Sequence, residues 1–84
     1  NLEQNYPNPF NPVTKIKYSL AKSSFVTMKI YDIPGNEIAV LVNETKSAGE
    51  YYAEWNAEGF PSGVYFYRMI VDGQMFQKKM VLIK

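Results

Sequence analysis

The sequence contains no cysteine and no histidine among its 84 residues. Without cysteine there is no disulfide and no thiol chemistry, which is compatible with an exported domain without showing one. Without histidine the chain lacks the commonest general base and the commonest metal ligand, so a serine nucleophile would depend on lysine. Asp32, Glu37 and Asp72 could meet around calcium, but no spaced aspartate motif supports such a site. We therefore expect no catalytic residue, no metal and no cofactor.

Long hydrophobic runs and a strong net charge are also missing. The longest aliphatic run covers residues 38–42, far below the roughly 20 residues of a membrane-spanning helix. The net charge is +1, which provides no broad basic surface for nucleic acid. The charge is nevertheless uneven, because residues 1–67 carry a net −2 and residues 68–84 a net +3. The cations of the second part are Arg68, Lys78, Lys79 and Lys84.

What the sequence does contain is apolar and aromatic side chains, at 46% and 15% of the residues. This composition is typical of a folded domain rather than a disordered chain. A chain of this length buries only about 60% of its unfolded surface, so the aromatics must supply much of the burial. We expect residues 1–84 to form one domain. The chain starts at Asn1 rather than Met, which we interpret as a segment of a longer protein.

Apolar and polar residues alternate with a period of two along most of the chain, and no window shows helical periodicity. The strand at 37–42 is apolar on both faces, which predicts a central or bulged strand, and residues 43–49 read as a loop. Six strands, or seven if the N-terminal segment pairs, predict an all-β, immunoglobulin-like antiparallel β-sandwich. The strands are expected at about 14–20, 26–31, 37–42, 50–55, 64–71 and 75–83.

Residues 1–12 form a proline-rich and asparagine-rich segment that cannot be a helix or a central strand. We expect an ordered, extended leader, with Tyr6 and Phe10 anchoring it to the core. Further along, residues 33–36 suit a type II turn and Asp72-Gly73 suits a two-residue hairpin. The residues expected to shape turns are Pro9, Pro12, Gly35, Gly49 and Gly73.

Several aromatic residues cannot all point inward on alternating strands. Tyr31, Tyr52 and one side of residues 65–67 are the examples. They could pair across strands and stiffen the sheet. They could also form an exposed platform for sugars or for a protein, as in a carbohydrate-binding module that uses Tyr52 or Trp55.

Residues 2–20, LEQNYPNPFNPVTKIKYSL, resemble the start of type A C-terminal sorting domains of the type IX secretion system. The leader and the Thr-x-Ile-x-Tyr strand both fit. Later blocks fit in the same order: Tyr31-Asp32-Ile33-x-Gly35, Ala48-Gly49 before Tyr51 and Trp55, Ser62-Gly63-Val64-Tyr65-Phe66-Tyr67-Arg68, and the basic-aliphatic ending at residues 78–84. The Ig-like domain of flagellar hook-capping proteins is similar in the middle blocks.

This resemblance implies a non-catalytic signal at the C-terminus of a larger cargo protein. An outer-membrane translocon would read the folded, monomeric tag, and a sortase-like cell-surface peptidase would often remove it. The cargo would then be released or joined to lipopolysaccharide at the surface of a Gram-negative bacterium, and no small-molecule substrate or nucleic acid would be involved. The recognition residues expected from this interpretation are Lys78, Lys79, Lys84, Gly63 and Tyr65. The alternatives are a carbohydrate-binding or adhesive module and a structural spacer of an appendage protein.

Overall fold

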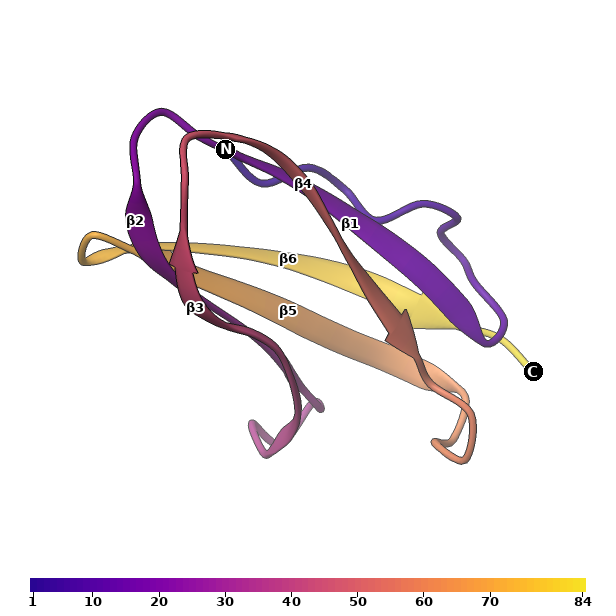
Figure 1. The fold of residues 1–84 in the computed structure, drawn as a ribbon. Helices are drawn as coiled ribbons and strands as arrows, with labels where there is room; N and C mark the ends of the chain where they lie inside the picture. The colour runs from indigo at the N-terminus through magenta and orange to yellow at the C-terminus, as the bar shows by residue number, and fades with distance from the viewer.

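The computed structural model describes all of residues 1–84 and consists of strands and loops only (Figure 1). It therefore contains no helix that could cross a membrane. The predicted all-β antiparallel sandwich is confirmed. The strands are β1 (Val13–Leu20), β2 (Ser24–Tyr31), β3 (Glu37–Lys46), β4 (Gly49–Asn56), β5 (Gly63–Val71) and β6 (Gln74–Leu82).

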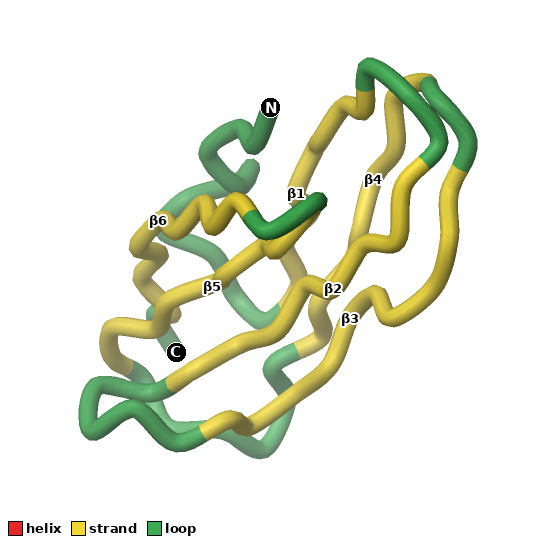
Figure 2. Tube along the Cα trace, turned by 90° about the vertical axis from the view of Figure 1, so that its left-hand side faces the viewer, coloured by secondary structure: helices red, strands yellow, loops and turns green.

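The strands form two antiparallel sheets of unequal size (Figure 2). The smaller sheet pairs β1 with β4 in unbroken register from Val13↔Asn56 to Leu20↔Gly49. The larger sheet has the order β3-β2-β5-β6, so β3 and β6 lie at its two edges. Because alternate residues of a strand point to opposite faces, each sheet has one face toward the core and one toward solvent.

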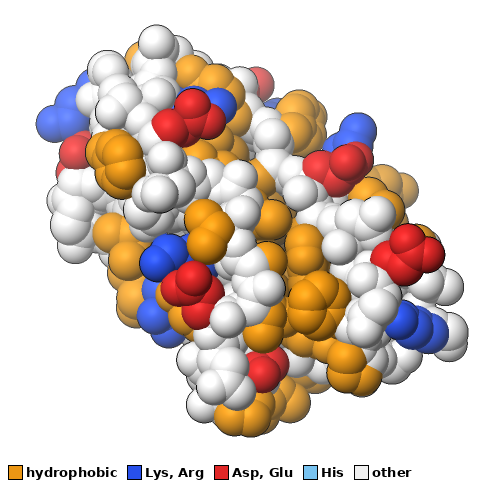
Figure 3. Space-filling view, turned by 60° about the horizontal axis from the view of Figure 1, so that its bottom comes forward, with side chains coloured by type: hydrophobic (Ala, Val, Ile, Leu, Met, Phe, Trp, Pro, Cys, Tyr) orange, Lys and Arg blue, Asp and Glu red, His pale blue; other side chains and the backbone are white.

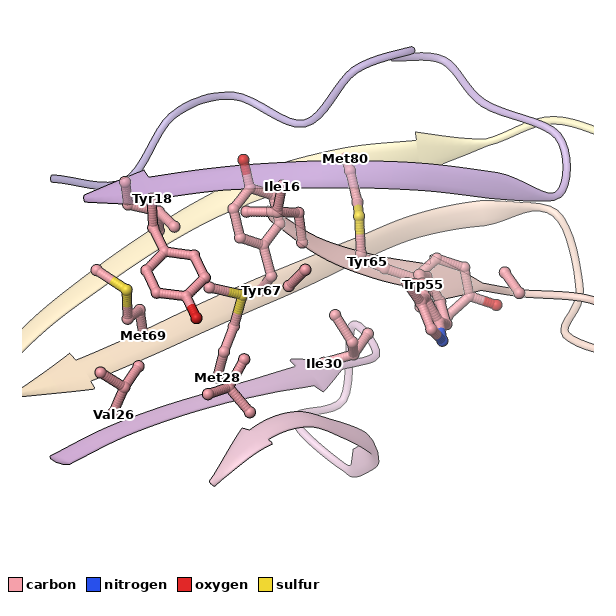
Figure 4. Close-up of a cluster of buried hydrophobic side chains, with 14 of the residues drawn as sticks. Ile16, Tyr18, Val26, Met28, Ile30, Trp55, Tyr65, Tyr67, Met69 and Met80 are labelled. Atoms are coloured by element: carbon pink, nitrogen blue, oxygen red, sulfur yellow. The ribbon is translucent and has the colours of Figure 1, made fainter. Parts of the chain in front are cut away.

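The core lies between the sheets and is built from the alternate apolar residues of each strand (Figure 4). Ile16 and Tyr18 of β1 face Met28 of β2 and Tyr67 of β5, and all four are at most 1% exposed. Aromatic rings fill one end of the core, where Trp55 packs against three others. Its partners are Phe10 at 5.8 Å, Phe60 at 5.6 Å and Tyr65 at 5.3 Å between ring centroids.

Strand β3 is longer than expected and lies at an edge. The predicted loop at residues 43–49 is wrong, because residues 43–46 continue the pairing with β2 and only residues 47–48 connect β3 to β4. The predicted bulge is confirmed by two register shifts against β2, whereas the predicted central position is wrong. The bulges change the face to which β3 side chains point, which explains its apolar residues on both sides.

The turn residues behave largely as their types suggest. Asp72 and Gly73 both have positive φ, 50° and 76°, as a two-residue hairpin turn between β5 and β6 requires. Gly35 also has positive φ, 98°, but its turn begins one residue earlier than predicted. Its amide donates to the Asp32 carbonyl at 3.0 Å, and the Asp32 side chain accepts from the same amide at 3.1 Å.

The leader, residues 1–12, lies against the sandwich but is not a seventh strand, and it bends at residues 7–9 and 11–12. It runs beside β1, pairing through isolated bridges at Leu2 and Tyr6, and then reaches β6 through a bridge at Phe10. Phe10 is 2% exposed and anchors the leader in the core, as expected. The anchoring role predicted for Tyr6 is wrong, because its side chain is 81% exposed. Asn5 replaces it as a buried anchor, 2% exposed and hydrogen-bonded to Thr14 at 3.0 Å.

Candidate functional site

Strand β6 points alternate side chains toward the core and toward solvent. Met80 and Leu82 are buried, which fixes the alternation of the whole strand, since its pairing with β5 runs without a register shift. Lys79 therefore points outward and is exposed. Lys78 points to the same, inward side as Met80 and is half-buried. Only one of the two neighbouring lysines thus lies on the outer face.

None of the C-terminal lysines is neutralised within the chain. The three ion pairs join Lys17 to Glu50, Lys29 to Glu37 and Lys46 to Glu44, and all involve other strands. Lys84 follows the end of β6 and is exposed, while its backbone N–H donates to Ser62 Oγ at 3.1 Å. The C-terminal segment therefore keeps its positive charge available to a partner.

The other two predicted recognition residues lie in less accessible positions. Tyr65 is 5% exposed, packs on Trp55 and donates its hydroxyl to the Pro61 carbonyl at 2.6 Å. Burial, with a smaller effect of Asp32, raises the pKa of the Tyr65 hydroxyl. Gly63 begins β5 with a φ of 150° and is half-buried. Both residues shape the fold beside β6, and neither offers an exposed side chain.

The outer faces of β5 and β6 form one continuous surface, which we call the β5–β6 outer face. It carries apolar and cationic side chains in cross-strand pairs. Phe66 lies opposite Lys79, Arg68 opposite Gln77 and Ile70 opposite Met75. Ile70 and Met75 are 42% and 60% exposed. Exposed hydrophobic side chains also form a band across the side of the molecule seen in Figure 3, with charged side chains beside it.

Strand β2 extends this surface and holds Arg68 in place. The Arg68 guanidinium lies 4.4 Å from the centre of the Tyr31 ring, and its Nε donates to Gln77 at 3.0 Å. Lys29, which lies opposite Arg68, is paired with Glu37 at 3.0 Å. Glu37 is the one carboxylate among these outward residues, so cations outnumber anions there. The surface is both apolar and positively charged.

The leader covers the backbone of the second half of β6. Phe10 donates to the Val81 carbonyl at 3.0 Å and accepts from the Ile83 amide at 2.9 Å. Asn8 Oδ1 accepts from the Val81 amide at 3.0 Å, and Gln4 donates to the Lys79 carbonyl at 2.8 Å. The backbone of this edge is already paired from Lys79 to Ile83. A partner can reach it there only through side chains, while the edge before Lys79 stays open.

The chain offers little else for chemistry. No group of three or more acidic side chains could hold a metal ion. Burial raises the pKa of the Tyr18 hydroxyl. Burial also raises the pKa of Tyr67 to about 12, and the hydrogen bond from the Asn5 backbone amide opposes only part of this increase. Both hydroxyls therefore stay protonated near neutral pH and act as structural groups.

Sequence reasoning identified the C-terminal lysines but missed the surface that surrounds Lys79. Arg68 was counted only as part of the basic segment, although its alternation with Tyr67 and Met69 signals an outward position. The aromatic platform was also placed wrongly, because Tyr31 and Tyr52 lie on different sheets. Trp55, the other proposed sugar contact, is 4% exposed and belongs to the core.

Comparison with known proteins supports an export signal. A family model described as the secretion system C-terminal sorting domain matches residues 4–84. No curated protein and no solved structure matches the chain. A domain of this family marks a cargo protein for secretion or cell-surface export from a Gram-negative bacterium. The chain therefore belongs to the family of secretion system C-terminal sorting domains, the type IX export signals that its leader and strand motifs resemble.

Proposed function

We propose that residues 1–84 act as one non-catalytic sorting module, and that the outer-membrane translocon reads it through the β5–β6 outer face and Lys84. The observation that carries this proposal is the exposed, unpaired Lys79 on an apolar sheet face that no other part of the chain covers. An apolar surface with cations fits a partner surface that is apolar and acidic. Such complementarity favours fast and specific encounter.

Arg68, Gln77 and Lys79 are the side chains best placed to make the polar contacts. Arg68 is held by Tyr31 and Gln77, so it loses little conformational freedom on binding. Lys79 has no partner within the chain and gives a flexible charge. Lys78 is half-buried, and we assign it a smaller share of the recognition.

Recognition by side chains is favoured over strand addition along the whole of β6. The leader already pairs with the backbone from Lys79 to Ile83, so a receptor strand would have to displace Phe10 from the core. Only the edge before Lys79 remains for main-chain pairing.

The proposal is tested by fusing residues 1–84 to a periplasmic reporter in a bacterium that has a type IX secretion system. Deleting residues 79–84 is a poor test, because it removes the buried Met80 and Leu82 and unfolds the domain. Reversing one exposed charge is cleaner. We expect Lys79→Glu to lower the secreted fraction by about tenfold, as a loss of roughly 1.4 kcal/mol of binding energy would.

The matched control is Lys22→Glu, which reverses an exposed lysine in the turn between β1 and β2. It changes the net charge equally but lies away from the β5–β6 outer face. The proposal fails if the intact fusion stays in the periplasm, or if both variants reduce export to the same extent. Circular dichroism of the purified variants verifies that each is folded.

We further propose that a sortase-like peptidase separates the tag from its cargo before the leader. The backbone of Glu3 and Tyr6 is hydrogen-bonded to β1, and that of Phe10 to β6, whereas a peptidase requires an extended and unpaired segment. Mass spectrometry of the exported cargo tests this. A C-terminus that lies within residues 3–10 would contradict it.

A further inference from the structure

A second surface, on the outer side of β1, has side chains that the sorting function does not use. It is an open hollow of about 320 Å³, lined by Glu3, Gln4, Tyr6, Lys15, Lys17 and Tyr52. We propose that this hollow binds a neutral oligosaccharide, with Tyr6 and Tyr52 as the two stacking platforms. The proposal is independent of the export signal, because the hollow and the β5–β6 outer face belong to opposite sheets.

The two tyrosines are exposed although their backbones are rigid. Tyr6 is 81% exposed, yet its amide and carbonyl both pair with Lys15, at 2.9 and 3.0 Å. Tyr52 is 67% exposed in the middle of β4, opposite Lys17. Neither ring packs on another aromatic ring, in contrast to Tyr51, which stacks on Tyr18. Large exposed aromatics without an internal partner are typical of binding surfaces.

The polar side chains between the tyrosines match the needs of sugar hydroxyls. Lys15 and Lys17 donate, Glu3 accepts, and the Gln4 amide has an oxygen that the chain leaves unpaired. The lysines give the site no excess positive charge, because Glu50 pairs with Lys17 at 3.6 Å and Glu54 lies opposite Lys15. A site without excess positive charge has no electrostatic preference for an anionic ligand, which favours a neutral glycan over a nucleic acid or an acidic polymer.

The geometry favours several sugar units over one. Tyr6 and Tyr52 flank β1 on either side, and their partners Lys15 and Lys17 are two residues apart. Strand spacing and rise then separate the Cα atoms of the two tyrosines by about 12 Å. Tyrosines on either side of β1 favour a ligand that spans this strand, as an oligosaccharide does. The volume of about 320 Å³ lies at the small end of the roughly 300–1,000 Å³ of ligand pockets.

The test is an NMR titration of the 84-residue chain with cellohexaose, chitohexaose, mannohexaose and maltohexaose. We expect saturable shifts confined to the residues of the hollow with at least one of the four probes. Tyr6→Ala and Tyr52→Ala should each weaken that binding by about tenfold, the upper end of what one aromatic contact provides. Tyr52→Trp should retain it, because the stacking face is preserved.

The control variant is Phe25→Ala, which removes an aromatic side chain of similar exposure from the other sheet. It should leave the binding unchanged. The proposal is overturned if no probe gives saturable shifts up to its solubility limit, or if binding survives both Tyr→Ala substitutions. Export of the reporter fusion should be unaffected by either tyrosine substitution, which keeps the two functions separable.

Discussion

The hydroxyl of Tyr67 joins the leader to β5, and its removal is a sharp test of how the leader is held. The Tyr67 side chain is 0% exposed. The Tyr67 hydroxyl accepts a hydrogen bond from the Asn5 backbone amide at 2.9 Å and donates one to the Glu3 carbonyl at 2.7 Å. Tyr67→Phe deletes both hydrogen bonds while keeping the ring in the core. The substitution therefore isolates the polar contribution from the packing contribution.

The expected loss of stability follows from what each partner can do afterwards. The Glu3 carbonyl belongs to an exposed residue and can turn to water, so its lost bond costs about 1 kcal/mol. Asn5 is 2% exposed, so its amide stays buried without a partner at a cost of roughly 1–3 kcal/mol. We expect Tyr67→Phe to lower the free energy of unfolding by about 2–4 kcal/mol.

Urea unfolding measures this difference, with Tyr52→Phe as the control because its exposed side chain makes no hydrogen bond. The difference should also depend on pH. Burial raises the pKa of Tyr67 from 10.0 to about 12, so the folded state favours the protonated hydroxyl. The stabilisation by Tyr67 is complete below pH 10 and is lost as the pH rises toward about 12.

The gap in stability between the natural chain and Tyr67→Phe should therefore shrink over this pH range. A cost below about 0.5 kcal/mol at neutral pH, the level of an ordinary surface substitution, would refute the role assigned to this hydroxyl. So would a gap that does not change with pH.

Three further substitutions test the leader and the hairpin by urea unfolding. Phe10→Ala removes the ring that packs on Trp55 and should lower the free energy of unfolding by about 3–5 kcal/mol. A loss near 1 kcal/mol would show that the leader does not belong to the core. Thr14→Val puts a methyl group in place of the buried hydroxyl that donates to the Pro7 carbonyl of the leader, and it should lower the free energy of unfolding by about 1–3 kcal/mol. An unchanged stability would contradict the role of this hydroxyl. Gly73→Ala places a side chain at a φ of 76° and should cost about 1 kcal/mol, whereas a gain would mean that the turn relaxes.

The parts of the fold that depend on residues adjacent in the sequence were predictable from it. Alternation located β1, β2 and β4, and Asp72-Gly73 located the last hairpin, because both signals are local. Strand β3 was harder. Its residues 43–46 are polar because they lie on an exposed edge strand, and a polar edge strand looks like a loop in the sequence.

The candidate site was predictable only in part, for a similar reason. Charge alone indicated the lysines of the last strand, but their phase depends on Met80 and Leu82 reaching the core. Burial of Tyr65 depends on Trp55 of the opposite sheet, and exposure of Tyr6 depends on which strand the leader follows. Pairing partners distant in sequence decide both, and no local pattern encodes them.

The leader gives a physical reason for the two ends of the chain to carry the most recognisable motifs. A two-stranded sheet is marginal in water, and the leader adds a third element along β1 through Leu2 and Tyr6. The same segment closes the second half of β6 through Asn8 and Phe10. The leader and the terminal strand are therefore one structural unit. If so, a substitution that frees the leader should impair export even when every lysine of β6 is intact.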